Sequence, residues 1–192
     1  MIINNVKLVL ENEVVSGSLE VQNGEIRAFA ESQSRLPEAM DGEGGWLLPG
    51  LIELHTDNLD KFFTPRPKVD WPAHSAMSSH DALMVASGIT TVLDAVAIGD
   101  VRDGGDRLEN LEKMINAIEE TQKRGVNRAE HRLHLRCELP HHTTLPLFEK
   151  LVQREPVTLV SLMDHSPGQR QFANREKYRE YYQGKYSLTD AQ

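Results

Sequence analysis

The sequence contains a single cysteine, Cys137, among its 192 residues. One thiol excludes a framework of disulfides within the chain, and it also excludes a zinc site built from several thiolates of one chain. Any metal ion bound by this chain must therefore use histidine, aspartate and glutamate side chains.

Positive charge is also scarce. The 21 Lys and Arg residues against 29 Asp and Glu residues give a formal net charge of −8, which argues against a broad nucleic-acid-binding surface. No stretch approaches the roughly 20 apolar residues of a membrane span, and the first residues, MIINNVKLVLENE, carry charges where a signal peptide would be apolar. We therefore expect a cytoplasmic protein with neither a nucleic acid nor a membrane as its partner.

The length of the chain is below the roughly 250 residues of a complete (β/α)8 barrel. Residues 1–46 contain short apolar runs separated by Asn, Ser and Gly, and Asn23-Gly24 is typical of a tight hairpin turn. A run rich in Asp and Gly at 41–45 then marks a boundary. We predict a small β-sheet domain over residues 1–46 and a second domain over residues 47–192.

The second domain shows an alternation of strand and helix patterns. Strands are predicted at 47–55, 89–95, 132–138 and 157–163, and helices at 78–88, 107–125 and 145–153. This alternation indicates an α/β fold with a parallel sheet, and four strands are half of an eight-stranded barrel. The last residues, SLTDAQ, are typical of a helix start, so we expect residues 47–192 to be the truncated amino-terminal half of a (β/α)8 barrel.

The first predicted strand of this domain ends in His55 and Asp57. Residues two apart in an extended chain point to the same side, so these two side chains are predicted to project together. An imidazole nitrogen and a carboxylate oxygen are ligands for a divalent metal ion. The alternative is a solvated polar loop after a strand.

Polar residues also stand at the ends of the other three predicted strands, namely Asp94, Glu138 and the pair Asp164-His165. In a parallel barrel the carboxyl ends of all strands open onto one face, where catalytic residues gather. Each of these residues could instead cap a helix or bind loop amides. We expect a structural role for Asp94.

The order of these motifs resembles a known family. A short β domain followed by WLLPGLIELHTD and GITTVLD is similar to the start of an amidohydrolase-superfamily enzyme, although Asp57 stands where most members carry a second histidine. The segments ELHTDNLDKFFTPRPKVDW, HLRCEL and SLMDHSPGQRQF resemble one branch, the α-D-ribose 1-methylphosphonate 5-triphosphate diphosphatases of the carbon-phosphorus lyase pathway. The resemblance implies hydrolysis of that small-molecule substrate to α-D-ribose 1-methylphosphonate 5-phosphate and pyrophosphate.

The resemblance also implies a cofactor and a set of site residues. The cofactor is a divalent metal ion, zinc or manganese, and the implied ligands are His55, Asp57, Glu138 and His165, with Glu138 as a bridging carboxylate. The catalytic base is expected beyond residue 192. Basic residues near the strand ends are candidates for binding the anionic substrate, each with a solvated surface charge as the alternative: Lys61, Arg66, Lys68, Arg136 and Arg170.

The remaining six histidines carry no comparable argument from the sequence pattern. They are His74, His80, His131, His134, His141 and His142. The last two could line the mouth of the site, although a polar loop after Pro140 explains them equally well.

Two other functions remain open at the level of the sequence. The first is an amidohydrolase that acts on a cyclic amide or imide, since the superfamily shares this first motif. The second is a non-catalytic remnant that binds a metal or associates with itself. An open half barrel exposes two strand edges and apolar surface, so we expect a homo-oligomer.

Overall fold

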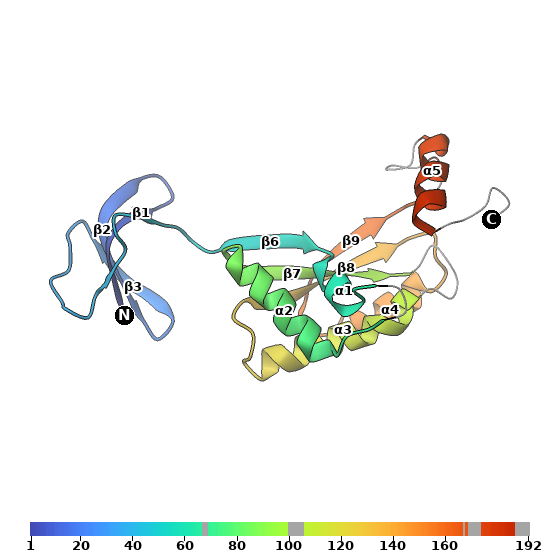
Figure 1. Cartoon of the computed structure of the whole chain (residues 1–192), viewed down its shortest axis with the longest axis horizontal. Helices are drawn as coiled ribbons and strands as arrows, with labels where there is room; N and C mark the ends of the chain where they lie inside the picture. Colours follow the sequence, from blue (N-terminus) through green and yellow to red (C-terminus); the bar gives the residue numbers. More distant parts are fainter. Residues whose placement is uncertain (67–68, 100–105, 167, 169–173, 187–192) are drawn as a thin grey trace. The chain divides into compact units, whose positions relative to one another are not determined.

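The computed structural model describes residues 1–66, 69–99, 106–166, 168 and 174–186. The chain divides into two compact units, Met1–Gly50 and Leu51–Gln192 (Figure 1).

The first unit is a small sheet. Its strands are β1 (Ile2–Val9), β2 (Val14–Gln22), β3 (Glu25–Ala30), β4 (Met40–Asp41) and β5 (Trp46–Leu47). The order is β3-β2-β1-β4, with β5 also pairing with β1. Asn23 and Gly24 join β2 to β3 with φ angles of 54° and 79°, which confirms the predicted turn. The core is formed by four side chains, Val6, Leu8, Val15 and Leu19.

The second unit alternates strands and helices. Its elements are β6 (Leu51–Thr56), α1 (Asn58–Phe63), α2 (Ala73–Ala86), β7 (Ile89–Ile98), α3 (Asp106–Lys123), β8 (Glu130–Glu138), α4 (Thr144–Leu151), β9 (Val157–Met163) and α5 (Arg175–Tyr186). The four strands are parallel and lie in the order β6-β7-β8-β9. This is the arrangement of half a (β/α)8 barrel, and it agrees with the predicted α/β class.

Two predicted boundaries are wrong. The first strand of the sheet begins at Leu51 rather than at residue 47, because Trp46 and Leu47 pair with β1 of the first unit. The helix predicted at 78–88 begins at Ala73, directly after Pro72. Proline is tolerated at a helix start because its missing N–H would have no intrahelical partner there.

Two of the described helices, α1 and α5, were not predicted, and one prediction is not covered. The helix α1 follows the His-x-Asp motif directly, although the sequence pattern indicated no helix there. The helix start predicted at the end of the chain, in residues 187–192, lies outside the described residues.

The core of the second unit lies between the sheet and its helices. Leu111, Ile115 and Ile118 of α3 are buried, in agreement with the apolar stripe of the helix predicted at 107–125. They pack with Leu133 and Leu135 of β8, which are fully buried. Among the described helices, we find none with the length and apolar character that crossing a bilayer requires.

The two outer strands of this sheet expose apolar side chains. On β6, Leu51, Ile52 and Leu54 are each about 60% exposed, and on β9 Leu162 is 58% exposed. Each of these strands has one neighbour among the described strands. Exposed apolar strands at the edges of a sheet are typical of a surface that packs against further protein.

The core position Leu135 provides a test of this packing. Leu135→Ala should lower the free energy of unfolding by about 2–5 kcal/mol, because it removes a fully buried side chain and leaves a cavity. Leu145→Ala on α4 is the matched control, since that side chain is 64% exposed and its loss should cost less than about 0.5 kcal/mol. Urea unfolding followed by circular dichroism measures both, and equal losses would contradict the described core.

Candidate active site

Polar side chains from three strands meet at the carboxyl edge of the second sheet. His55 ends β6, and His134 and Arg136 lie on β8 at positions two apart, so they point to one side of that strand. Strand β7 lies between them and contributes Ala95 and Ala97, which pair with His134 and Arg136. Because alanine side chains are short, groups from β6 and β8 can meet above β7.

His55 and Asp57 project together, as their spacing predicts. The distance between His55 Nε2 and Asp57 Oδ2 is 3.8 Å, and both side chains are about half exposed. Arg136 Nη1 donates a hydrogen bond of 2.6 Å to Asp57 Oδ1. The Arg136 side chain is only 17% exposed, and its buried Nε atom has no hydrogen-bond partner among the described residues. The guanidinium group therefore orients Asp57 and retains a donor.

His134 belongs to this site, although the sequence pattern gave no argument for it. Its Nδ1 atom donates to the carbonyl oxygen of Leu54 at 3.2 Å, so its Nε2 atom accepts from the Ser161 hydroxyl at 2.8 Å. The rings of His134 and His55 contact each other edge to face, with their centroids 5.1 Å apart. Burial, and then the neighbouring His55, lower the pKa of His134 below its ordinary value. The signal in the sequence was its alternation with Arg136 in HLRCE.

Glu138 and His165 form a second pair at the same edge. The buried Glu138 carboxylate accepts a hydrogen bond of 2.9 Å from the backbone N–H of His165 and also bonds to the Nδ1 atom of that imidazole. The carboxylate of Asp164 accepts from the Ser166 backbone N–H instead, at 2.9 Å. The four implied metal ligands thus lie as two pairs. In the described part of the chain, no three of them converge on one point.

The predicted cations are distributed unevenly. Lys61 is exposed, and its Nζ atom lies 3.4 Å from the side-chain oxygen of Asn58. Arg66 is also exposed, and its backbone forms an isolated β-bridge with Val69. Lys68 and Arg170 lie outside the described residues. Among the cations that the structure describes, Arg136 is the one that contacts an implied metal ligand.

A different group of ligand atoms does converge, on the helix-covered side of the sheet. His80 of α2 and His131 of β8 bond to the two carboxylate oxygens of Asp94 on β7, at 2.5 Å and 2.7 Å. One ligand atom from each residue lies within 4.8 Å of the others, and this is the group of three found among the described residues. These buried residues could hold a metal ion.

The sequence predicted a structural role for Asp94, but it did not indicate that His80 and His131 are its hydrogen-bond partners. Asp94 stands in the otherwise apolar segment VLDAVAI, whereas His80 and His131 have polar and charged neighbours in the sequence, so no local pattern singled them out. Polar groups that a fold buries must find hydrogen-bond partners, so such residues are expected to meet one another.

Comparisons with known proteins bear on the fold. No protein-family model matches the sequence. A solved D-hydantoinase is 18% identical, with a TM-score of 0.48 over 83% of this chain and 32% of its own. A mutant of atrazine chlorohydrolase from Arthrobacter aurescens TC1, complexed with zinc and atraton, is 11% identical, with a TM-score of 0.51 over 94% of this chain and 58% of its own.

Both structures are of amidohydrolase-superfamily members, and this chain spans about a third of one and somewhat more than half of the other. At 11% identity the similarity to the chlorohydrolase is one of fold. It agrees with the fold of a partial (β/α) barrel.

The lowered pKa of His134 predicts a pH dependence of stability. A histidine whose pKa is depressed by folding stabilises the fold fully above the unfolded value of about 6.5, and this stability is lost as the pH falls towards the folded pKa. In metal-free buffer, His134→Gln should therefore reduce the loss of stability between pH 7.5 and pH 5.5. Urea unfolding at both pH values measures it. His142→Gln, at an exposed histidine, is the control, and an equal change in both variants would contradict the assignment.

Proposed function

We propose that this chain forms part of a metal-dependent hydrolase whose active site lies at the carboxyl edge of β6 to β9. The proposed substrate is α-D-ribose 1-methylphosphonate 5-triphosphate, which is cleaved to α-D-ribose 1-methylphosphonate 5-phosphate and pyrophosphate. The observation that carries the proposal is the contact of Arg136 with Asp57 beside His55. It combines candidate metal ligands with a phosphate-binding side chain in one place.

The donor atoms at this edge suit a divalent ion. His55 and Asp57 would hold it from one side, and Glu138 and His165 are the further candidates, which together give the imidazole and carboxylate donors that zinc and manganese accept. When bound, such an ion supplies an activated water and polarises a phosphoryl oxygen. Asp57 keeps about half of its side chain exposed, so its carboxylate is accessible to an ion from solvent.

The protein residues supply positioning and charge. His134 is held by Leu54 and Ser161, and its ring edge limits the rotation of the His55 imidazole. The fork of donors on arginine suits the oxygens of a phosphate group, and its charge offsets the negative charge of a triphosphate. Asp57 uses only one of the donors on Arg136.

The space at the contact between Asp57 and Arg136 limits what can bind there. A hollow of about 20 Å³ is lined by both residues together with Asp60, Ala95, Val96, Ala97 and Met114. This volume holds one water-sized atom. A single phosphoryl oxygen or a water molecule therefore fits beside the two bonded side chains, and the body of a ribose triphosphate would lie on the open side of the sheet.

Phosphorus NMR provides the test of this function. The purified enzyme that contains this chain, supplied with zinc or manganese, should release pyrophosphate from the ribose triphosphate. Arg136→Ala should lower the rate by about 10²-fold, because it removes charge stabilisation and leaves Asp57 without its partner. His55→Ala should lower the rate at least as much.

His74→Ala is the control for these variants. His74 is half exposed, pairs with Glu120 on the helix-covered side, and should leave the rate unchanged. Hydrolysis of a cyclic imide without pyrophosphate release would favour the amidohydrolase alternative. If the enzyme that contains this chain is folded and loaded with metal but acts on neither substrate, the proposal is wrong.

A further inference from the structure

The buried group His80, Asp94 and His131 lies apart from the site at the carboxyl edge. Asp94 pairs with Leu133, whose side chain belongs to the core between the sheet and the helices. His134, the next residue along β8, points to the opposite face, towards His55. The buried group is therefore a separate feature of the second unit, and its role is independent of the proposed function.

Two carboxylates lie close to one imidazole ring in this group. Asp81 and Asp94 are both buried, with the His131 ring between them: Nδ1 lies 2.7 Å from Asp94 and Nε2 lies 3.3 Å from Asp81. The guanidinium of Arg128 is 3.8 Å from Asp81, but its side chain is 60% exposed. Two carboxylates taken out of water require compensating positive charge close by.

We propose that His80, Asp94 and His131 bind a divalent transition-metal ion, of which zinc is the reference case, as a structural site between α2 and the sheet. The ligand atoms are Nε2 of His80, a carboxylate oxygen of Asp94 and Nδ1 of His131, all within 4.8 Å of one another. Two imidazoles and a carboxylate form a donor set that zinc accepts. Each ligand comes from a different element, so the ion would tie α2, β7 and β8 together.

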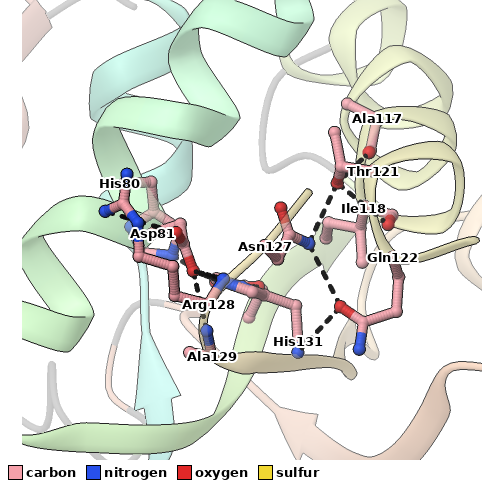
Figure 2. Close-up of polar contacts among 11 residues, drawn as sticks. His80, Asp81, Ala117, Ile118, Thr121, Gln122, Asn127, Arg128, Ala129 and His131 are labelled. Atoms are coloured by element: carbon pink, nitrogen blue, oxygen red, sulfur yellow. Dashed lines mark hydrogen bonds and ion pairs between the residues drawn. The ribbon is translucent and has the colours of Figure 1, made fainter. Parts of the chain in front are cut away.

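Asp81 supplies the outer support that such a site requires. A histidine that ligates a metal usually donates its other N–H to a carboxylate or carbonyl group, and Nε2 of His131 faces Asp81 in this way. Asp81 Oδ1 also accepts hydrogen bonds from the backbone N–H groups of Arg128 and Ala129, at 3.0 Å and 2.9 Å (Figure 2). Gln122 fixes the start of β8 by accepting from the His131 backbone N–H. The orientation of the His131 ring is therefore set by its surroundings.

An ion also needs a path to the buried group. His131 lines a hollow of about 740 Å³ at the amino end of β8. Three carboxylates, those of Glu119, Glu130 and Glu155, line the same hollow. Glu119 and Glu130 pair with Arg154 and Arg132, and Lys123 and Arg132 also line the hollow. The His131 side chain is itself fully buried, so an ion would reach its ring from this hollow only as the surrounding side chains move.

The metal site can be tested in a variant that lacks His55 and Asp57, one of the two pairs of candidate ligands at the carboxyl edge. His55→Gln combined with Asp57→Asn disables the carboxyl-edge site and leaves all three buried ligands in place. After equilibration with zinc and removal of excess metal, we expect one zinc ion per chain by mass spectrometry. Cobalt in place of zinc should give visible absorption bands, and a chelator should lower the melting temperature of this variant.

His131→Gln in the same background distinguishes a bound metal ion from a group held together by hydrogen bonds alone. It should abolish the retained zinc, the cobalt bands and the chelator effect, whereas His142→Gln should preserve all three. If the folded carboxyl-edge variant retains no zinc and its melting temperature does not respond to the chelator, the buried group is held by hydrogen bonds without a metal and the proposal is wrong. This result is measured on the carboxyl-edge variant alone, so it decides the question even if His131→Gln does not fold. Pyrophosphate release tests the proposed function separately, so the failure of either proposal would leave the other standing.

Discussion

The second unit depends most on the hydrogen bonds of the Asp94 carboxylate. This carboxylate bonds to His80 of α2 and His131 of β8 at once, so it joins the first covering helix to the two central strands. Burial alone would raise the pKa of Asp94, but the hydrogen bonds with His131 and His80 outweigh burial and lower it. Loss of this carboxylate would leave Nε2 of His80 and Nδ1 of His131 without their hydrogen-bond partner, at about 1–3 kcal/mol for each.

Strand β8 shows how one segment serves both the core and the site. Its side chains alternate between two faces, so Leu133, Leu135 and Cys137 pack under the helices while His134 and Arg136 reach the other face. A shift of the β7–β8 register by one residue would exchange the two sets. The helix-side hydrogen bond between Asp94 and His131 spans the same pair of strands, and the geometry of the exposed site therefore depends on a buried contact.

The open edges of the sheet set the context in which this site works. Leu51, Ile52 and Leu54 on β6, with Leu162 on β9, expose apolar surface that a closed barrel would cover. The chlorohydrolase that shares the fold is longer, and this chain spans 58% of it. The two ligand pairs, His55 with Asp57 and Glu138 with His165, lie along an edge that further strands could complete. Such additional protein would also shield the site from water, which strengthens electrostatic interactions within it.

The sequence by itself determined the α/β class, the hairpin turn at Asn23 and the location of His55 and Asp57 at a strand end, because these follow from local periodicity and backbone preference. It also predicted that Glu138 and His165 lie near each other, since parallel strands end at one edge. Only the tertiary structure brought His80 and His131 to Asp94 and showed that Arg136 bonds to Asp57. These contacts join residues up to 79 positions apart, and packing between separate elements, which no local pattern encodes, decides them.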